Sequence, residues 1–182
     1  VHKDVKVVLE GVSDYAEVGV MRIANDKMFE NKFLMPEDCL DANEHRGSGV
    51  MNDAAERIVR TFFDRSNCPE TNFFLGEDVH FPGKWSSYPP HTHDEPEFYY
   101  YKMLPENGYG FSEYCGDGRL IKHNDCLGFP SKTQHSQVVA PGYSMFYVWC
   151  IPLKEDRNIK TEVVEEFKWA SDPAAKFFPN ED

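Results

Sequence analysis

The sequence predicts an all-β protein, either a sandwich or a barrel, on three observations. Short runs rich in aromatic and β-branched residues follow one another from residue 85 onward, with turn residues between them every eight to ten positions. Hydrophobic residues make up 41% of the 182 residues and aromatic residues 14%, which is enough to form a core. The charged fraction of 27% is ordinary for a globular domain, so disorder is not expected.

The N-terminal region gives weaker signals than the rest of the chain. Two short strands are expected at residues 4–9 and 15–23, joined by a Gly-Val-Ser-Asp turn. Residues 24–45 show no clear period and are interpreted as a crossing segment or linker. Residues 54–57 favour helix and residues 58–63 favour strand, so a strand is predicted for the second half of this region.

The remainder of the chain is predicted to be strands joined by tight turns, which are marked by proline, glycine and asparagine. The expected strands cover residues 72–81, 97–104, 109–115, 119–123, 126–130, 135–140 and 143–153. After them, residues 160–170 are expected to form a short helix. Phe177 and Phe178 are expected to dock on the body of the protein or on a partner.

Charge and cysteine usage narrow the class of protein. The formal net charge is −12 and no basic stripe is present, so nucleic acid and anionic membranes are not expected as partners. The five cysteines are scattered and never form a CxxC pair, which favours a reducing compartment. No apolar run approaches the length of a membrane span, and no signal-peptide pattern is present. A soluble, cytoplasmic protein is therefore expected.

Two histidines and a glutamate form the most informative pattern in the chain. Side chains alternate faces along a strand, so His91 and His93 point the same way, roughly 7 Å apart, and Glu97 keeps their parity. A bend at residues 94–96 can bring Glu97 back toward the imidazoles. His135, at the start of a later strand, offers a fourth ligand. Such ligands suit a divalent cation such as zinc, manganese, iron, nickel or cobalt.

An HxH pair that stands alone is more often fortuitous than ligating, and it is the added glutamate and the later histidine that favour a metal site here. The remaining histidines lack a same-face partner at ligand spacing, so they are expected at the surface or in turns. These are His2, His45, His80 and His123.

The ligand residues also carry a known family pattern. HxHxxxE from His91 and PxxxxH ending at His135 resemble the two motifs of the cupins. The stretches WSSYPPHTHD (residues 85–94) and HSQVVAPGYSMFYVW (residues 135–149) further resemble the 5-deoxy-glucuronate isomerases of inositol catabolism and, more distantly, the 5-keto-4-deoxyuronate isomerases.

The chain departs from the general cupin motifs at three positions. Trp85 and Lys132 stand where glycines are usual, and Val139 replaces the usual asparagine. The four metal-ligand positions are intact.

The resemblance implies a division of the chain into three parts. A metal-binding cupin barrel, in which strands of a jelly roll form a double-stranded β-helix, would cover residues 46–157. Residues 1–45 resemble the remnant of a first cupin half, as a short partial β segment or linker strands. Residues 158–182 would be a C-terminal tail. A homodimer is also expected, because a barrel half leaves exposed sheet edges.

The resemblance further implies a metal-dependent isomerase that interconverts the aldose and ketose forms of a uronic or deoxyuronic acid. One divalent metal would be held by His91, His93, Glu97 and His135, with zinc or manganese expected before nickel or iron. The partner would be a small anionic sugar. Two alternatives stay open: a cupin dioxygenase that uses the same ligands, and a non-catalytic cupin that binds a sugar acid.

Moving a proton between neighbouring carbons requires an acid–base group near the metal. Glu113 is a candidate because it shares its strand face with two aromatic residues, although an ordinary exposed carboxylate explains it as well. Tyr99 and Tyr101 share the face of Glu97 and are candidate hydrogen-bond donors to the sugar. Aromatic lining of the barrel is the alternative interpretation of these two tyrosines.

The carboxylate of the substrate requires a cation. Lys84, Lys102 and Arg119 are the candidates, with Lys132 as a further one, and arginine suits a bidentate contact best. Lys84 and Tyr88 are preferred because they flank the ligand segment. Solvated surface side chains are the alternative in each case.

Overall fold

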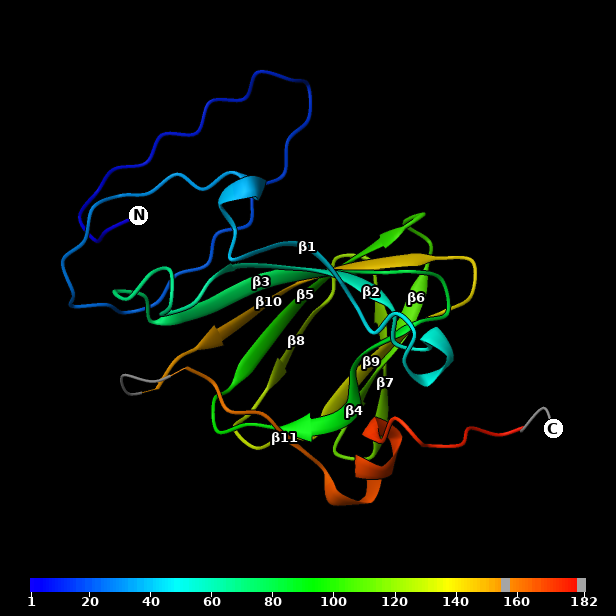
Figure 1. The fold of residues 1–182 in the computed structure, drawn as a ribbon. Helices are drawn as coiled ribbons and strands as arrows, with labels where there is room; N and C mark the ends of the chain where they lie inside the picture. The colour runs from blue at the N-terminus through cyan, green and yellow to red at the C-terminus, as the bar shows by residue number, and fades with distance from the viewer. Residues whose placement is uncertain (155–157, 180–182) are drawn as a thin grey trace.

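The structure, a computed structural model, describes residues 1–154 and 158–179 and contains two antiparallel β-sheets that pack face to face (Figure 1). The six-stranded sheet has the order β1 (Asp41–Arg46), β2 (Arg57–Phe63), β3 (Phe73–His80), β10 (Ser144–Pro152), β5 (Glu97–Leu104), β8 (Cys126–Phe129). The five-stranded sheet has the order β11 (Glu162–Val163), β4 (Trp85–Thr92), β9 (His135–Val139), β6 (Tyr109–Tyr114), β7 (Asp117–Lys122). The prediction of an all-β protein is confirmed.

Short 3-10 helices complete the described secondary structure. They are η1 (Pro36–Asp38), η2 (Met51–Asp53) and η3 (Glu165–Ser171). The short helix expected at residues 160–170 is formed only in its second half, as the 3-10 helix η3, and Glu162–Val163 form a short strand instead. The helix favoured at residues 54–57 does not form, because β2 already begins at Arg57 and pairs with β3. No helix among the described residues is long and apolar enough to cross a membrane.

The core lies between the two sheets, and the alternation of side chains along each strand decides what enters it. In β5, Tyr99, Tyr101 and Met103 are buried, whereas Phe98 and Leu104 are exposed. β10 pairs with both β3 and β5 and contributes Met145, Tyr147, Trp149 and Ile151 to the core. From the other sheet, Ile121 and Val139 meet these rings. The interior is thus rich in phenol groups, which are apolar over most of their surface and polar at one end.

The two strands expected at residues 4–9 and 15–23 are not formed; this prediction was wrong. Residues 1–35 contain no strand or helix, and many of their apolar side chains are exposed, including Val8 at 74% and Val12 at 96%. A two-stranded ribbon without a third strand or a covering layer is marginally stable in water. Hydrogen bonds join the segment to the body of the protein: Asn72 Nδ2, immediately before β3, donates to the carbonyl of Ala24 (2.9 Å), and Lys102 Nζ in β5 donates to Glu17 (2.6 Å).

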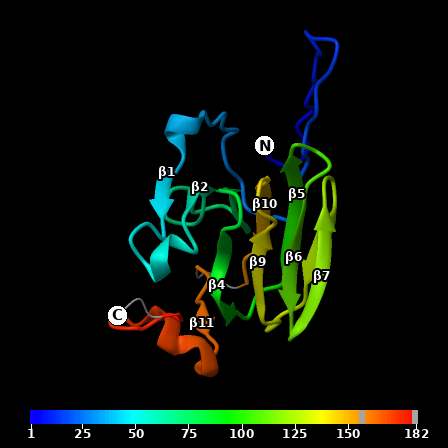
Figure 2. The same cartoon turned by 90° about the vertical axis from the view of Figure 1, so that its right-hand side faces the viewer.

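The C-terminal segment adds to the barrel. β11 pairs with β4, with Val163 opposite His91 (Figure 2). After η3, the ring of Phe177 packs on Trp169 at a centroid distance of 5.6 Å, and Phe178 is 88% exposed.

Gly76 in β3 provides a test of the packing between strands. A Cβ built at this position overlaps the indole ring of Trp149 and lies 2.7 Å from the carbonyl oxygen of Arg60. We expect Gly76→Ala to lower the free energy of unfolding by about 1–3 kcal/mol, because the backbone contact leaves no room for adjustment. Urea denaturation measures this loss. Gly118→Ala in β7, where a Cβ meets no atom within 4 Å, is the control and should change stability little. Equal stability of the two variants would contradict the packing described.

Candidate metal centre

Three histidines converge between β4 and β9. His91 is the register partner of His135 across the two strands, and their ring centroids are 4.5 Å apart. His93, which follows β4 directly, lies 5.4 Å from His135 and 6.1 Å from His91 by ring centroid. One ligand nitrogen from each ring can be chosen so that all three lie within 4.8 Å of one another.

Glu97 completes the cluster from a third strand. Its Oε2 lies 3.0 Å from His93 Nε2 and 3.1 Å from His135 Nε2, and the residue is only 3% exposed. We expected both histidines and the glutamate on one strand, and that detail was wrong: β4 ends at Thr92 and Glu97 begins β5. The expected bend at residues 94–96 is present, and Pro96, which has no N–H to donate to a ladder, helps to end the strand there.

The carboxylate of Glu97 and the neighbouring imidazoles shift one another's pKa values. Burial by itself raises the pKa of Glu97, but contacts with His135 and His93 outweigh burial and hold the pKa at about 2. Burial likewise lowers the pKa of His135, and the Glu97 carboxylate reverses this so that the net shift is upward. The pKa of His91 falls to about 4 because of burial and the neighbouring His135. Glu97 is therefore an anion and His91 a neutral imidazole at neutral pH, the forms in which both groups bind metals.

Backbone carbonyls orient two of the three rings. His91 Nδ1 lies 3.1 Å from the carbonyl oxygen of Ser87, and His135 Nδ1 lies 2.9 Å from that of Thr133. When the Nδ1–H of a neutral ring donates to its carbonyl, the lone pair is on Nε2, which is then the atom that can bind a metal. His93 Nδ1 is buried and has no hydrogen-bond partner among the residues that the structure describes. Three imidazoles and a carboxylate thus converge between the strands, and this donor set fits a single divalent cation.

The interior around the cluster contains both predicted tyrosines. The ring of Tyr99 lies 6.0 Å from that of His135, and its Oη is 3.5 Å from Ser87 Oγ. Tyr101, which is fully buried, donates its hydroxyl to Gln137 Oε1 at 2.9 Å. Burial raises the pKa of both phenols well above the usual value, so both stay protonated.

Other predicted residues are not brought to the histidines. Glu113 alternates in phase with the exposed side chains of β6, and its Oε1 accepts hydrogen bonds from Gly116 N–H (2.6 Å) and Gln134 Nε2 (3.1 Å). Lys102 lies on the outer face of β5, where it pairs with Glu17. Arg119 is exposed on β7, with its guanidinium 5.5 Å from the ring centroid of Tyr114.

Lys84 and Tyr88 remain beside the ligand segment. Lys84 is half-buried immediately before β4, and Val139 N–H donates to its carbonyl at 3.3 Å. Tyr88 packs on Trp85 at a centroid distance of 5.4 Å. Lys132 is exposed and lies 3.6 Å from Asp94 Oδ1.

A buried polar group was missed by sequence reasoning. Arg57, Asp78 and His80 point into the barrel, and Asp78 Oδ2 accepts hydrogen bonds from Arg57 Nε (3.1 Å) and Tyr147 Oη (2.7 Å). His80 was expected at the surface or in a turn and is instead fully buried, with its ring 5.2 Å from that of Tyr147. The available signal was the alternation of side chains along the strands. Arg57 lies on the same face of β2 as the buried Val59, and Asp78 lies on the same face of β3 as the buried Gly76.

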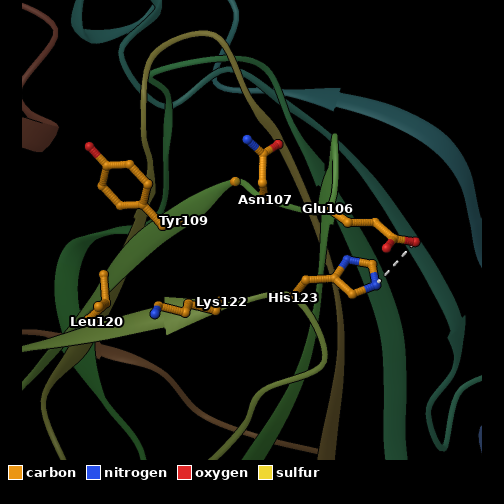
Figure 3. Close-up of a pocket in the computed structure, with 7 residues that line it drawn as sticks. Glu106, Asn107, Tyr109, Leu120, Lys122 and His123 are labelled. Carbon is orange, nitrogen blue, oxygen red and sulfur yellow. Dashed lines mark ion pairs between the residues drawn. The ribbon is translucent and has the colours of Figure 1, made fainter.

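A hollow of about 580 Å³ lies apart from the histidines, on the outside of the barrel. Glu106, Asn107 and Tyr109 line it from the β5–β6 turn, and Lys122 and His123 from the end of β7 (Figure 3). His123 Nε2 is 3.8 Å from Glu106 Oε1. None of the predicted site residues lines this hollow.

Two antiparallel sheets around three histidines and a glutamate give this protein a cupin fold. A cupin-like protein from Thermotoga maritima has the same fold, with a TM-score of 0.50 and 21% identity over 69% of this chain and 93% of the other. The chain matches the KduI/IolB family over residues 1–170, and it belongs to that family. The resemblance found in the sequence is confirmed.

Two further proteins resemble this chain. The 5-deoxy-glucuronate isomerase of Bacillus subtilis is 28% identical over 181 residues, which cover 91% of this chain and 60% of that protein. An IolB-like protein from Salmonella typhimurium LT2 has a TM-score of 0.64 and 21% identity, covering 71% of this chain and 52% of the other. The chain therefore spans about 60% of the length of the curated relative.

Proposed function

We propose that this protein is a metal-dependent isomerase that interconverts the aldose and ketose forms of a uronic or deoxyuronic acid. The observation that carries the proposal is the convergence of His91, His93, His135 and Glu97 inside the barrel of a KduI/IolB family member. Relatives named 5-deoxy-glucuronate isomerase favour 5-deoxy-glucuronate as substrate, which would place the reaction in inositol catabolism.

The cluster would hold one divalent cation, with zinc or manganese ahead of nickel or iron. When bound, such a cation polarises a carbonyl and the adjacent hydroxyl and stabilises the negative charge that develops during proton transfer. Glu97 would supply the cation with one negative charge, and His91 would supply a neutral imidazole nitrogen.

The protein's own side chains would orient the sugar and handle the proton. Tyr99, whose hydroxyl stays protonated and whose ring lies 6.0 Å from that of His135, is proposed to donate a hydrogen bond to a substrate oxygen. Tyr101 is already engaged with Gln137 and acts from further along the same face. Glu113 is omitted from the proposal, because its carboxylate caps a turn on the outer face. Lys84 and Tyr88, at the start of β4, are proposed to contact the anionic sugar.

The test combines elemental analysis with a reaction assay on the purified chain. We expect elemental analysis to find about one divalent metal ion per chain. We also expect NMR to show conversion of 5-deoxy-glucuronate to its ketose without oxygen consumption. Oxygen uptake in step with substrate loss would instead identify a dioxygenase. Stoichiometric metal and sugar-acid binding without conversion would identify a binding protein, and either result overturns the proposal.

A further inference from the structure

β4 breaks register immediately before the metal cluster. Ser86 is the partner of Gln137 and His91 is the partner of His135, so four residues of β4 (87–90) stand where β9 has one. Ser87, within this bulge, has a φ of +51°, a left-handed conformation that is costly for a residue other than glycine. Bulges next to functional sites commonly redirect a side chain. The direction of the His91 ring therefore depends on what holds this segment.

Two contacts hold the bulge at its first residues. The carbonyl of Ser87 accepts the hydrogen bond from His91 Nδ1–H. One residue earlier, Ser86 Oγ lies 2.7 Å from Tyr147 Oη. Because the Tyr147 hydroxyl donates its own hydrogen to Asp78 Oδ2, the Ser86 hydroxyl is the donor to Tyr147. The position of Ser86 is thus tied to a side chain on the opposite sheet.

The hydrogen bond from Tyr147 connects Ser86 to a buried ion pair between Asp78 and Arg57. Arg57 Nε donates a hydrogen bond to Asp78 Oδ2 (3.1 Å), and Arg57 Nη1 donates to the carbonyl of Ala55 (2.8 Å). Arg57, Asp78, Tyr147 and Ser86 are 8%, 3%, 2% and 0% exposed. A buried ion pair contributes little net stability compared with apolar packing of the same volume, because both charges lose their hydration. A role in fixing geometry accounts for the pair better than a role in stability.

We propose that the buried chain Arg57–Asp78–Tyr147–Ser86 positions His91, by fixing the start of the bulge whose carbonyl orients the imidazole. Ser86 and Tyr147 act as positioning residues for a metal ligand, and neither is itself a ligand. The inference rests on the proposed function, since it presumes that His91 binds a cation. Partners of this kind commonly change metal affinity by 10- to 100-fold when they are removed.

Cobalt(II) alone, added to the metal-free protein, is the probe. Tyr147→Phe keeps the ring that packs on Tyr99 at 4.7 Å and removes only the hydroxyl shared by Ser86 and Asp78. Ser86→Ala removes the other end of the same hydrogen bond and leaves the contact between Tyr147 and Asp78 intact. We expect both variants to bind cobalt about 10- to 100-fold more weakly than the wild type and to shift its visible absorption bands, which depend on ligand geometry.

Tyr100→Phe is the matched control. Its hydroxyl donates to Asn124 Oδ1 at 2.8 Å on the outer face of β5, so its loss should leave cobalt affinity and spectrum unchanged. Wild-type affinity and spectrum in both Ser86→Ala and Tyr147→Phe would overturn the positioning role while leaving the metal centre in place. A wild-type protein that binds no cobalt would overturn the metal centre itself, and the inference with it.

Discussion

Replacing His93 with alanine is expected to reduce bound metal below one ion per chain and to abolish isomerisation, with a loss of at least about 100-fold. The reason is that His93 is a direct ligand in the proposed centre, and even residues that only support a ligand commonly cost 10- to 100-fold in affinity or activity. The barrel should remain folded, because the core of Tyr99, Tyr101, Tyr147 and Trp149 does not depend on this imidazole. Elemental analysis, the NMR assay and circular dichroism measure these three quantities.

His45→Ala is the control for this experiment. His45 is exposed on β1 with its ring 6.3 Å from that of Phe81, far along the chain from any ligand. The His45→Ala variant should keep the wild-type metal content and the wild-type rate of isomerisation. If the His93 variant retains stoichiometric metal and wild-type rate, the ligand assignment is wrong.

Replacing Arg57 with methionine is expected to destabilise the protein by about 3–5 kcal/mol at pH 7, because it leaves the Asp78 carboxylate buried without its cation. The loss should shrink as the pH falls. Burial, opposed by Arg57, raises the pKa of Asp78 to about 6 in the folded protein, above the value of 3.8 for an unperturbed carboxyl. The stability from this raised pKa is full below about pH 4 and is lost as the pH rises through 6. Without Arg57 the pKa rises further, so protonation relieves the variant at mildly acidic pH.

Urea denaturation of the variant at pH 5 and pH 7 measures both effects. Arg60→Met is the matched control, since Arg60 pairs with Glu77 across the same two strands but on the outer face, with side chains 24% and 13% exposed. It should cost about 1 kcal/mol or less at either pH. An Arg57 variant as stable as the Arg60 variant, or one with no pH dependence, would contradict the description of this buried pair.

The residues of the candidate metal centre could be grouped from the sequence because their information is local. His91, His93 and Glu97 lie within seven positions, and alternation along an extended chain places them together whether or not the strand breaks at Pro96. His135 was found because a motif, and not a contact, assigned it. Most strands of the barrel body were likewise visible as aromatic and β-branched runs between turns, but β1 was missed because it lies in residues interpreted as a crossing segment or linker.

Other features required the pairing of distant strands. Alternation puts Glu113 on the same strand face as Tyr109 and Phe111, but it does not say which face of the sheet is inside. The aromatic neighbours suggested the inner face, whereas this face is on the outside of the barrel. His80 could not be placed because its surroundings, Asp78 and Tyr147, come together only when β3 pairs with β10. The segment at residues 4–9 has strand composition without a neighbouring strand to complete it. In each case the missing information was a long-range contact, which composition does not carry.

The short strand β11 pairs the C-terminal part of the chain with β4, the strand that carries His91 of the candidate metal centre. Val163 is the register partner of His91, and Val164 N–H donates to the carbonyl of Pro90 at 3.0 Å, within the bulge itself. If the candidate centre binds a cation, ion uptake and docking of the C-terminal strand would use the same backbone, and any coupling between them would act on both by the same free energy. A protease that trims undocked C-terminal residues would then act more slowly on the metal-loaded protein than on the metal-free protein.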